Sequence, residues 1–397
     1  MSVANLVRRF VSATALAALG LLGLSAGLTA PAQAQLNLVY VEGNVTTGSG
    51  NVIAGFSNDG TGNLTALSGS PYLTGGIGVT GVFSDIQFDS DGELVANKAG
   101  SLMFAVNGNS NTISAFTVNA NGSLSAIGSP IASGGQDPVS LALRENAYSN
   151  GDSLMVAVNK ASDPSQTGGI PNYTTFRVTT SGSVTMNAGS SLNLPSGSSP
   201  AQIMLRPGAP VQFFGIEFMS ARVALYRANM AGKLGLVSSD TTPSAVLGGI
   251  VHPSRGAVYG GLPLVSQLSV NKYTSGGALS FLRTVPNKGA LICWLAINPA
   301  GTRVYSGETG SGTISVYDTT NPGVPKQLQH FTLTPSGSLP AHLKLDPTGQ
   351  FLYVVDRGGS LHVLNVAGDG TVTETHTAVN LGMPAGAIPM GIVTMSK

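Results

Sequence analysis

Hydrophobic and polar residues alternate in short segments along most of the chain. Residues 111–118, 312–319 and 360–366 place apolar side chains at every second position, and Asn-Gly, Asp-Gly and Ser-Gly pairs stand between such segments. This pattern is typical of β-strands joined by tight turns. Helical periodicity is almost absent after residue 34. The sequence therefore predicts an all-β protein.

The strand pattern repeats along the chain. The clearest unit starts at His342 and runs HLKLDPTGQFLYVVDRGGSLHVLNVAGDGTVTETHTAVNL, which contains four strands and a Pro-x-Gly turn after the first strand. Similar units start at Trp294 and Asp85, and weaker units start near Ser140, Gln202 and Gly248. The starting positions lie 46 to 62 residues apart. This spacing matches a four-stranded propeller blade.

The two ends of the repeat region supply complementary parts of one further unit. The segment LNLVYVEG, from Leu36, matches the second strand of the repeat, whereas IPMGIVTM near the C-terminus matches its first strand and has no second strand after it. Six units and one composite unit predict a seven-bladed β-propeller, closed by pairing of the N- and C-terminal strands in one blade. A linear solenoid, the alternative, needs a capping unit at each end instead of two complementary fragments.

The first 34 residues have the layout of a secretory signal peptide. Arg8 and Arg9 precede an apolar stretch over residues 15–28, and the small-x-small triplet 32–34 follows it. We therefore expect a signal peptide at 1–34 and a propeller domain at 35–397. The apolar stretch is shorter than the roughly 20 residues that a spanning helix needs. The expected mature protein is exported, periplasmic or extracellular, and without a membrane span.

Composition excludes several classes of partner. The chain has 19 Lys and Arg against 18 Asp and Glu, and 9% of its residues are charged. This balance gives neither the basic surface of a nucleic-acid-binding protein nor a polybasic membrane patch. The single cysteine, Cys293, lies in the apolar run LICWLAI and is expected to be a buried thiol. We expect a monomer that binds a small-molecule ligand.

Motifs of well-known enzyme and metal sites are missing after residue 34. The one Gly-x-Ser-x-Gly match, 23–27, falls within the predicted signal peptide, and no His-Glu-x-x-His, paired-cysteine or phosphate-loop motif occurs. Asp89 begins a segment like a calcium loop, but the twelfth residue is Gly100 rather than Glu. The sequence therefore predicts no metal and no organic cofactor.

The repeat resembles a known family. The pattern Pro-x-His-Leu-x-Leu-Asp-Pro-x-Gly-x-Phe-Leu-Tyr-Val-Val over residues 340–355 is similar to the repeat of lactonase-type seven-bladed propellers, which include propeller-class 6-phosphogluconolactonases and carboxymuconate cyclases. Propellers with Tyr-Val-Thr-Asn repeats share a similar unit. The resemblance covers nearly all of the chain after residue 34 and is strongest in the units at Asp85, Trp294 and His342. It implies the fold, and it suggests lactone chemistry.

Propeller geometry selects the candidate site residues. The first strand of each blade begins on the face of the ring where the second strand ends, so both sets of positions surround one axial funnel. The first set is Asp85, Ser140, Gln202, Gly248, Trp294, His342 and Gly391. The second set is Gly43, Asn107, Asn159, Glu217, Leu262, Glu308 and Asp356. Most of these residues are polar, which is typical of a small-molecule site and also of a water-filled propeller channel.

Three residues are the candidate catalytic groups. His342 is the expected general base because imidazole titrates near neutral pH. Glu308 is its expected partner, and Arg357 is the cation for an oxyanion or a substrate carboxylate. The expected substrate-binding residues are Asp85, Gln202, Trp294, Asp356 and Glu217. The family pattern has Arg where this chain has Ala341, and Asn-Glu where it has Asp356-Arg357.

Two functions remain open from the sequence. One is an exported lactonase-like enzyme that hydrolyses or forms a small sugar lactone or carboxylated lactone. The other is a non-catalytic periplasmic or surface propeller that acts as a binding or scaffold module. Family resemblance and His342 favour the enzyme, whereas low charge and the two departures from the family pattern favour the binding module.

Overall fold

The structure is a computed structural model, and it describes residues 35–397 except 47, 49, 80–91, 163–165 and 210. The predicted signal peptide and Asp85 therefore lie outside the described residues. No helix in the described part of the chain has the length and apolar character needed to cross a membrane.

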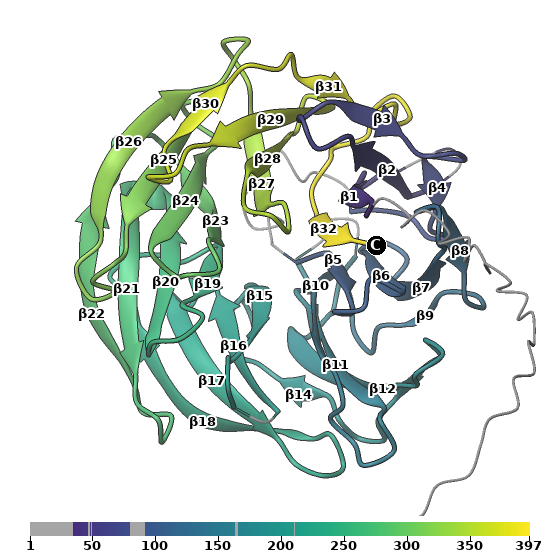
Figure 1. Cartoon of the computed structure of the whole chain (residues 1–397). Coiled ribbons are helices and arrows are strands. Elements are labelled where there is room, and N and C mark those ends of the chain that lie inside the picture. Colours follow the sequence, from purple (N-terminus) through teal and green to yellow (C-terminus); the bar gives the residue numbers. More distant parts are fainter. Residues whose placement is uncertain (1–34, 47, 49, 80–91, 163–165, 210) are drawn as a thin grey trace, which may run out of the picture. The chain divides into compact units, whose positions relative to one another are not determined.

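Seven antiparallel sheets surround a common axis (Figure 1). Blade 1 contains β32 (Ile392–Ser396), β1 (Asn37–Glu42), β2 (Val52–Asn58) and β3 (Leu64–Ala66), with β4 (Tyr72–Leu73) beside β2. Blade 2 contains β5 (Leu94–Ala96), β6 (Leu102–Asn107), β7 (Thr112–Val118), β8 (Leu124–Ala126) and β9 (Ile131–Ala132). Blade 3 contains β10 (Pro138–Arg144), β11 (Ser153–Asn159), β12 (Asn172–Val178), β13 (Val184–Met186) and β14 (Leu192–Asn193).

The remaining blades follow in chain order. Blade 4 contains β15 (Pro200–Leu205), β16 (Gln212–Glu217), β17 (Arg222–Ala228) and β18 (Leu234–Thr241). Blade 5 contains β19 (Gly249–Val251), β20 (Ala257–Leu262), β21 (Gln267–Tyr273) and β22 (Leu279–Pro286), with a short 3₁₀ helix at Pro263–Val265. Blade 6 contains β23 (Ile292–Ile297), β24 (Arg303–Glu308), β25 (Thr313–Asp318) and β26 (Lys326–Thr332). Blade 7 contains β27 (Pro340–Leu345), β28 (Phe351–Asp356), β29 (Ser360–Val366), β30 (Val372–Glu374) and β31 (Val379–Asn380).

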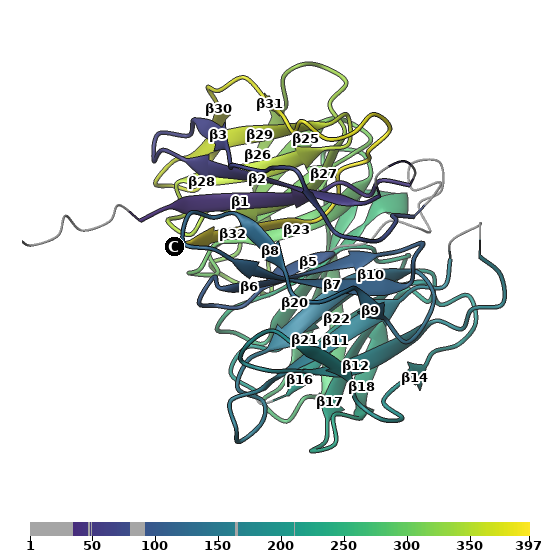
Figure 2. The ribbon, with the colours of Figure 1, turned by 90° about the vertical axis from the view of Figure 1, so that its right-hand side faces the viewer.

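The predicted closure in one blade is confirmed. β32 pairs with β1 and is the innermost strand of blade 1 (Figures 1 and 2). The register places Val41 opposite Ile392 and Leu38 opposite Met395. This pairing joins the two ends of the domain and occupies the inner edge that β1 would otherwise expose.

Side chains packed between neighbouring blades form the cores of the ring. Tyr40 and Met103 belong to one buried cluster, to which strands of blades 1 and 2 contribute. Tyr353 is also buried, and its hydroxyl accepts a hydrogen bond from the Asn58 amide of blade 1. Each such apolar side chain contributes about 1.5–3 kcal/mol on burial. The blades therefore stabilise one another by side-chain packing.

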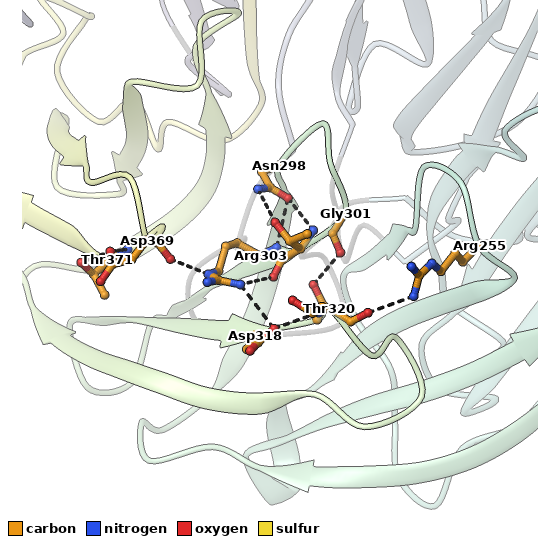
Figure 3. Close-up of polar contacts among 10 residues, drawn as sticks. Arg255, Asn298, Gly301, Arg303, Asp318, Thr320, Asp369 and Thr371 are labelled. Carbon is orange, nitrogen blue, oxygen red and sulfur yellow. Dashed lines mark hydrogen bonds and ion pairs between the residues drawn. The ribbon is translucent and has the colours of Figure 1, made fainter.

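Turns on one face of the ring add polar contacts between blades. The turn 298–301 is closed by the Asn298 side chain, whose Oδ1 accepts hydrogen bonds from the backbone N–H groups of Thr302 and Arg303 (Figure 3). The Arg303 guanidinium donates to the carbonyl of Asp369 in blade 7 at 2.6 Å and lies 3.3 Å from Asp318 in its own blade. Arg255 of blade 5 donates to the Thr320 carbonyl of blade 6. These contacts connect three successive blades.

The predicted start of the blade 2 repeat at Asp85 is wrong. The strand on the inner side of β6 is β5, with Leu94 opposite Ala105. Blade 7 places Leu343 opposite Val354 in the corresponding register, so Glu93 is the residue equivalent to His342. The sequence pattern is ambiguous here because two turn-like segments, 89–92 and 97–100, lie close together in this unit, and the second of them joins β5 to β6.

Candidate functional site

The starts of the inner strands form a ring of equivalent positions around the axis, on the face where the second strands end. We call this face the site face. With the corrected alignment of blade 2, the ring consists of Glu93, Ser140, Gln202, Gly248, Trp294, His342 and Gly391. The side chains of Glu93, Ser140, Gln202, Trp294 and His342 are buried.

His342 of blade 7 contacts Glu93 of blade 2 across blade 1. The imidazole Nδ1 lies 3.1 Å from the Glu93 carboxylate. The intervening ring position, in blade 1, is Gly391, and a Cβ atom at this position would lie 2.9 Å from the Glu93 Cβ. Glycine at this position therefore leaves the space in which the carboxylate and the imidazole meet.

Trp294 and Arg357 extend this cluster. The indole ring packs against the His342 imidazole, with ring centroids 4.2 Å apart and planes inclined by 44°. The Arg357 guanidinium lies 5.9 Å from the indole centroid, within cation–π distance. The structure thus brings together His342, Trp294 and Arg357, which the sequence had singled out. The exposed fraction is 0% for Trp294 and 1% for His342.

Glu308 has its hydrogen-bond partners in blade 6 and in the segment leading to it. Its carboxylate accepts hydrogen bonds from Asn287, Ser306 and Thr313. Burial raises the pKa of Glu308 to about 7, although these donors lower it. Glu308 is therefore a buried carboxyl group that can change protonation near neutral pH.

The other predicted binding residues are held by neighbouring protein groups. The Asp356 carboxylate lies 3.3 Å from His362, and Glu217 accepts hydrogen bonds from Arg222 and Tyr226. The Gln202 side-chain oxygen accepts the backbone N–H of Gly249 at 2.6 Å. Gln202 also borders an axial cavity of about 900 Å³ that is lined by inner strands of the ring. Of these three residues, only Gln202 lines this cavity.

Sequence reasoning missed several buried charged residues on the site face, among them Glu93, Glu42 and Lys160. Glu93 was hidden by the misaligned repeat, and Glu42 directly precedes Gly43 of the second set. Lys160 follows Asn159 directly, is buried, and has its ammonium 5.9 Å from the centroid of the Phe218 ring. For Glu42 the available signal is a charged residue at a position where the other repeats have valine, isoleucine or glycine.

The side chains of the site face are suited to acid–base chemistry. Within residues 35–397, outside the gaps given above, no cluster of three or more His, Cys, Asp or Glu side chains could hold a metal ion. The site face provides the His342 imidazole, whose Nδ1 lies 3.1 Å from the Glu93 carboxylate. The indole ring of Trp294 and the guanidinium of Arg357 lie next to it. These are the parts of a general base with its orienting group and a charge-stabilising cation.

Comparison with known protein families confirms the resemblance to lactonase-type propellers that the sequence predicts. The family model "Lactonase, 7-bladed beta-propeller" matches residues 251–387. No curated protein matches the sequence.

Solved structures share the fold across almost the whole domain. A protein from Lactobacillus plantarum has a TM-score of 0.71 at 17% identity, over 91% of this chain and 99% of that one. The periplasmic gluconolactonase of Pseudomonas aeruginosa has a TM-score of 0.69 at 16% identity, over 91% and 99%. A candidate 6-phosphogluconolactonase from Bacteroides fragilis has a TM-score of 0.68 at 15% identity, over 90% and 98%. At these identities the likeness concerns the fold.

Proposed function

We propose that this protein is an exported, monomeric lactonase-like propeller that opens or forms the ring of a small sugar lactone or carboxylated lactone on its site face. The observation that supports it best is the Glu93–His342 contact, with Trp294 packed on the imidazole. The similarity of residues 251–387 to the lactonase family model also supports lactone chemistry. The leader pattern in residues 1–34 and the fold shared with a periplasmic gluconolactonase support export.

The proposed reaction uses the imidazole for proton transfer. In this scheme the Nδ1 nitrogen of His342, 3.1 Å from the Glu93 carboxylate, keeps its hydrogen, and Nε2 accepts a proton from water as the water oxygen bonds to the lactone carbonyl carbon. The carbonyl oxygen becomes an oxyanion, which Arg357 stabilises. The ring C–O bond then breaks, and the departing alkoxide takes the proton from Nε2. Ring formation is the reverse sequence, and neither direction uses a metal or an organic cofactor.

The Glu93 carboxylate has two roles in this scheme. It fixes the imidazole tautomer, because the hydrogen lies on Nδ1, and it stabilises the imidazolium that forms when Nε2 takes the proton. Trp294 restricts rotation of the imidazole by packing against it. The polar residues of the site face that surround this cluster are then Glu308, Gln202, Glu217 and Asp356.

The alternative is a binding module without catalysis. It is favoured by the burial of Trp294 and His342, since a general base must reach its substrate. In this alternative, the cluster stabilises the centre of the ring, and ligands bind to the surface around it.

A lactone-hydrolysis panel on the protein starting at Gln35 tests the proposal. We expect turnover of a sugar lactone or carboxylated lactone, with a rate that rises with pH as the imidazole loses its proton. His342→Ala should lower turnover by about 10²-fold or more. His330→Ala is the matched control because His330 is exposed on β26 in blade 6. Turnover that His342→Ala leaves unchanged contradicts the assignment, and absence of turnover across the panel favours the binding module.

Export has its own test. N-terminal sequencing of the protein from its native cells should give Gln35 as the first residue, with the protein in the periplasmic or culture fraction. A cytoplasmic protein that begins at Met1 would refute this part of the proposal.

A further inference from the structure

Glu42 is a carboxylate at a position where the other blades have apolar or small residues. The strand registers make it equivalent to the residues directly before the second set, which are Val106, Val158, Ile216, Gly261, Gly307 and Val355. Glu42 is 2% exposed. Its Oε1 accepts a hydrogen bond from Asn51 at 2.7 Å, and its Oε2 has no hydrogen-bond partner among the described residues. An ionised carboxylate in such surroundings is costly.

Glu42 and Glu93 line the same small cavity between neighbouring blades. The cavity has a volume of about 20 Å³, which is enough for one water molecule. Asn44 and Asn51 also line it, and Val79, Val106, Val139 and Met390 make up much of the remaining wall. Two like charges at such a site raise one another's cost of ionisation. Burial raises the pKa of Glu42 well above its usual range, and the nearby Glu93 raises it further.

Other charged groups surround the pair on several elements. His342 on β27 contacts Glu93, and the guanidinium of Arg357, also from blade 7, lies 5.9 Å from the centroid of the Trp294 ring. Gly108, after β6, lines the cavity, and the buried Asp137 lies close to it. The contact of the pair that this inference concerns is the one between the Glu93 carboxylate and the His342 imidazole, 3.1 Å apart.

We propose that Glu42 and Glu93 act as a carboxylate pair that holds one proton, with the proton on Glu42 and the negative charge on Glu93. Glu93 is then a positioning residue for His342, and the pair presents a single negative charge to the imidazole. The water-sized cavity that both residues line has room for a water molecule beside them. The inference deepens the proposed function because the imidazole is its general base, but the carboxylate pair can be tested without any lactone.

The test is an NMR pH titration of the His342 imidazole in the protein starting at Gln35, with the signal assigned by its loss in His342→Gln. Glu93→Gln should lower the titration midpoint by about one to three pH units, because it removes an adjacent negative charge. Glu42→Gln should leave the midpoint unchanged, because Glu42 is already neutral. Glu374→Gln is the matched control, since Glu374 contacts His362 in the same blade and should alter that histidine alone.

Three outcomes would overturn the inference. An equal lowering by Glu42→Gln and Glu93→Gln would mean that both carboxylates are ionised. An unchanged midpoint in Glu93→Gln would mean that its charge does not act on His342. The third is that Glu42→Gln removes no protonated-carboxyl band from the infrared spectrum, which would mean that Glu42 does not hold the proton. If a glutamine variant does not fold, Glu42→Val and Glu93→Ser replace it, because equivalent blades have Val106 and Ser140 at these positions.

The lactone panel separates this inference from the proposed function. Loss of turnover in His342→Ala with no midpoint shift in Glu93→Gln would retain the enzyme and reject the pair. The midpoint shift without any turnover would retain the pair and reject the enzyme.

Discussion

Blade 7 contains two buried histidines whose surroundings differ. His362 on β29 lies between two carboxylates of its own sheet, with Nδ1 2.6 Å from Glu374 and Nε2 3.3 Å from Asp356. Burial lowers the pKa of His362, but the hydrogen bonds to Asp356 and Glu374 more than offset this and raise it to about 9. His342 on β27 contacts one carboxylate, Glu93, which comes from blade 2.

The difference shows how the source of a partner changes the role of a histidine. Neighbouring strands position both partners of His362, so this site needs only blade 7 to form. The contact of His342 depends on closure of the ring, because blade 1 must place Gly391 between the two side chains. We infer that the contacts of His362 with Asp356 and Glu374 stabilise the sheet of blade 7. The contact of His342 with Glu93 forms only when the ring is assembled.

The largest expected effect comes from deleting residues 390–397. This change removes β32, exposes the inner edge of β1 and takes away the buried side chains of Ile392, Val393 and Met395. At about 1.5–3 kcal/mol each, their loss should lower the free energy of unfolding by more than about 4 kcal/mol. Thermal melts of both forms measure the effect. Equal midpoints would contradict the ring-closure argument.

The next effect is a loss of stability in alkaline solution through His362. Because the pKa of His362 is raised on folding, from about 6.5 to about 9, its contribution is complete below pH 6.5 and is lost as pH rises through about 9. The shift corresponds to about 3 kcal/mol. Urea unfolding at pH 6 and pH 9.5 should show this decrease, and His362→Gln should reduce the pH dependence over the same range. If the free energy of unfolding of His362→Gln changes with pH as much as that of the unmodified protein, His362 is not the source of the pH dependence.

A smaller effect is expected from Gly391→Ala. The added Cβ would lie 2.9 Å from the Glu93 Cβ, so the two backbones or the Glu93 side chain must shift. Overpacking of this kind costs about 1–3 kcal/mol. The NMR signal of His342 should change, while that of His362 stays the same. Gly368→Ala, where no atom lies within 4 Å of the added Cβ, is the matched control. A His342 signal that stays unchanged in Gly391→Ala would contradict the spacer role.

The smallest effect is expected at Arg303, in the turn contacts of Figure 3. Its ion pair with Asp318 lies 3.3 Å apart and is partly exposed to solvent. Such pairs contribute about 0–1 kcal/mol. Arg303→Gln should therefore change the free energy of unfolding by no more than about 1 kcal/mol, with both histidine signals unchanged. A loss larger than that of Gly391→Ala would show that this network matters more than the axial packing.

The all-β class, the seven blades and the strand pairing that closes the ring can be predicted from the amino-acid sequence alone. These features follow from local alternation of apolar residues and from a repeat long enough to define a blade, so each unit supplies independent support. His342, Trp294 and Arg357 were also found this way, because the units at Trp294 and His342 match the repeat closely and fix their ring positions.

The contacts between side chains at the axis cannot be predicted in this way, because they depend on how the blades pack around the ring. Glu93 and His342 are 249 residues apart in sequence, and their contact depends on the absence of a side chain at Gly391 in the blade between them. Glu308 and Asp356 looked like site residues by position, but their carboxylates are held by groups in or next to their own blades. Repeat alignment predicts the position of a residue in the ring. The sizes of the side chains around it and the neighbouring hydrogen-bond donors determine which groups a buried charge contacts.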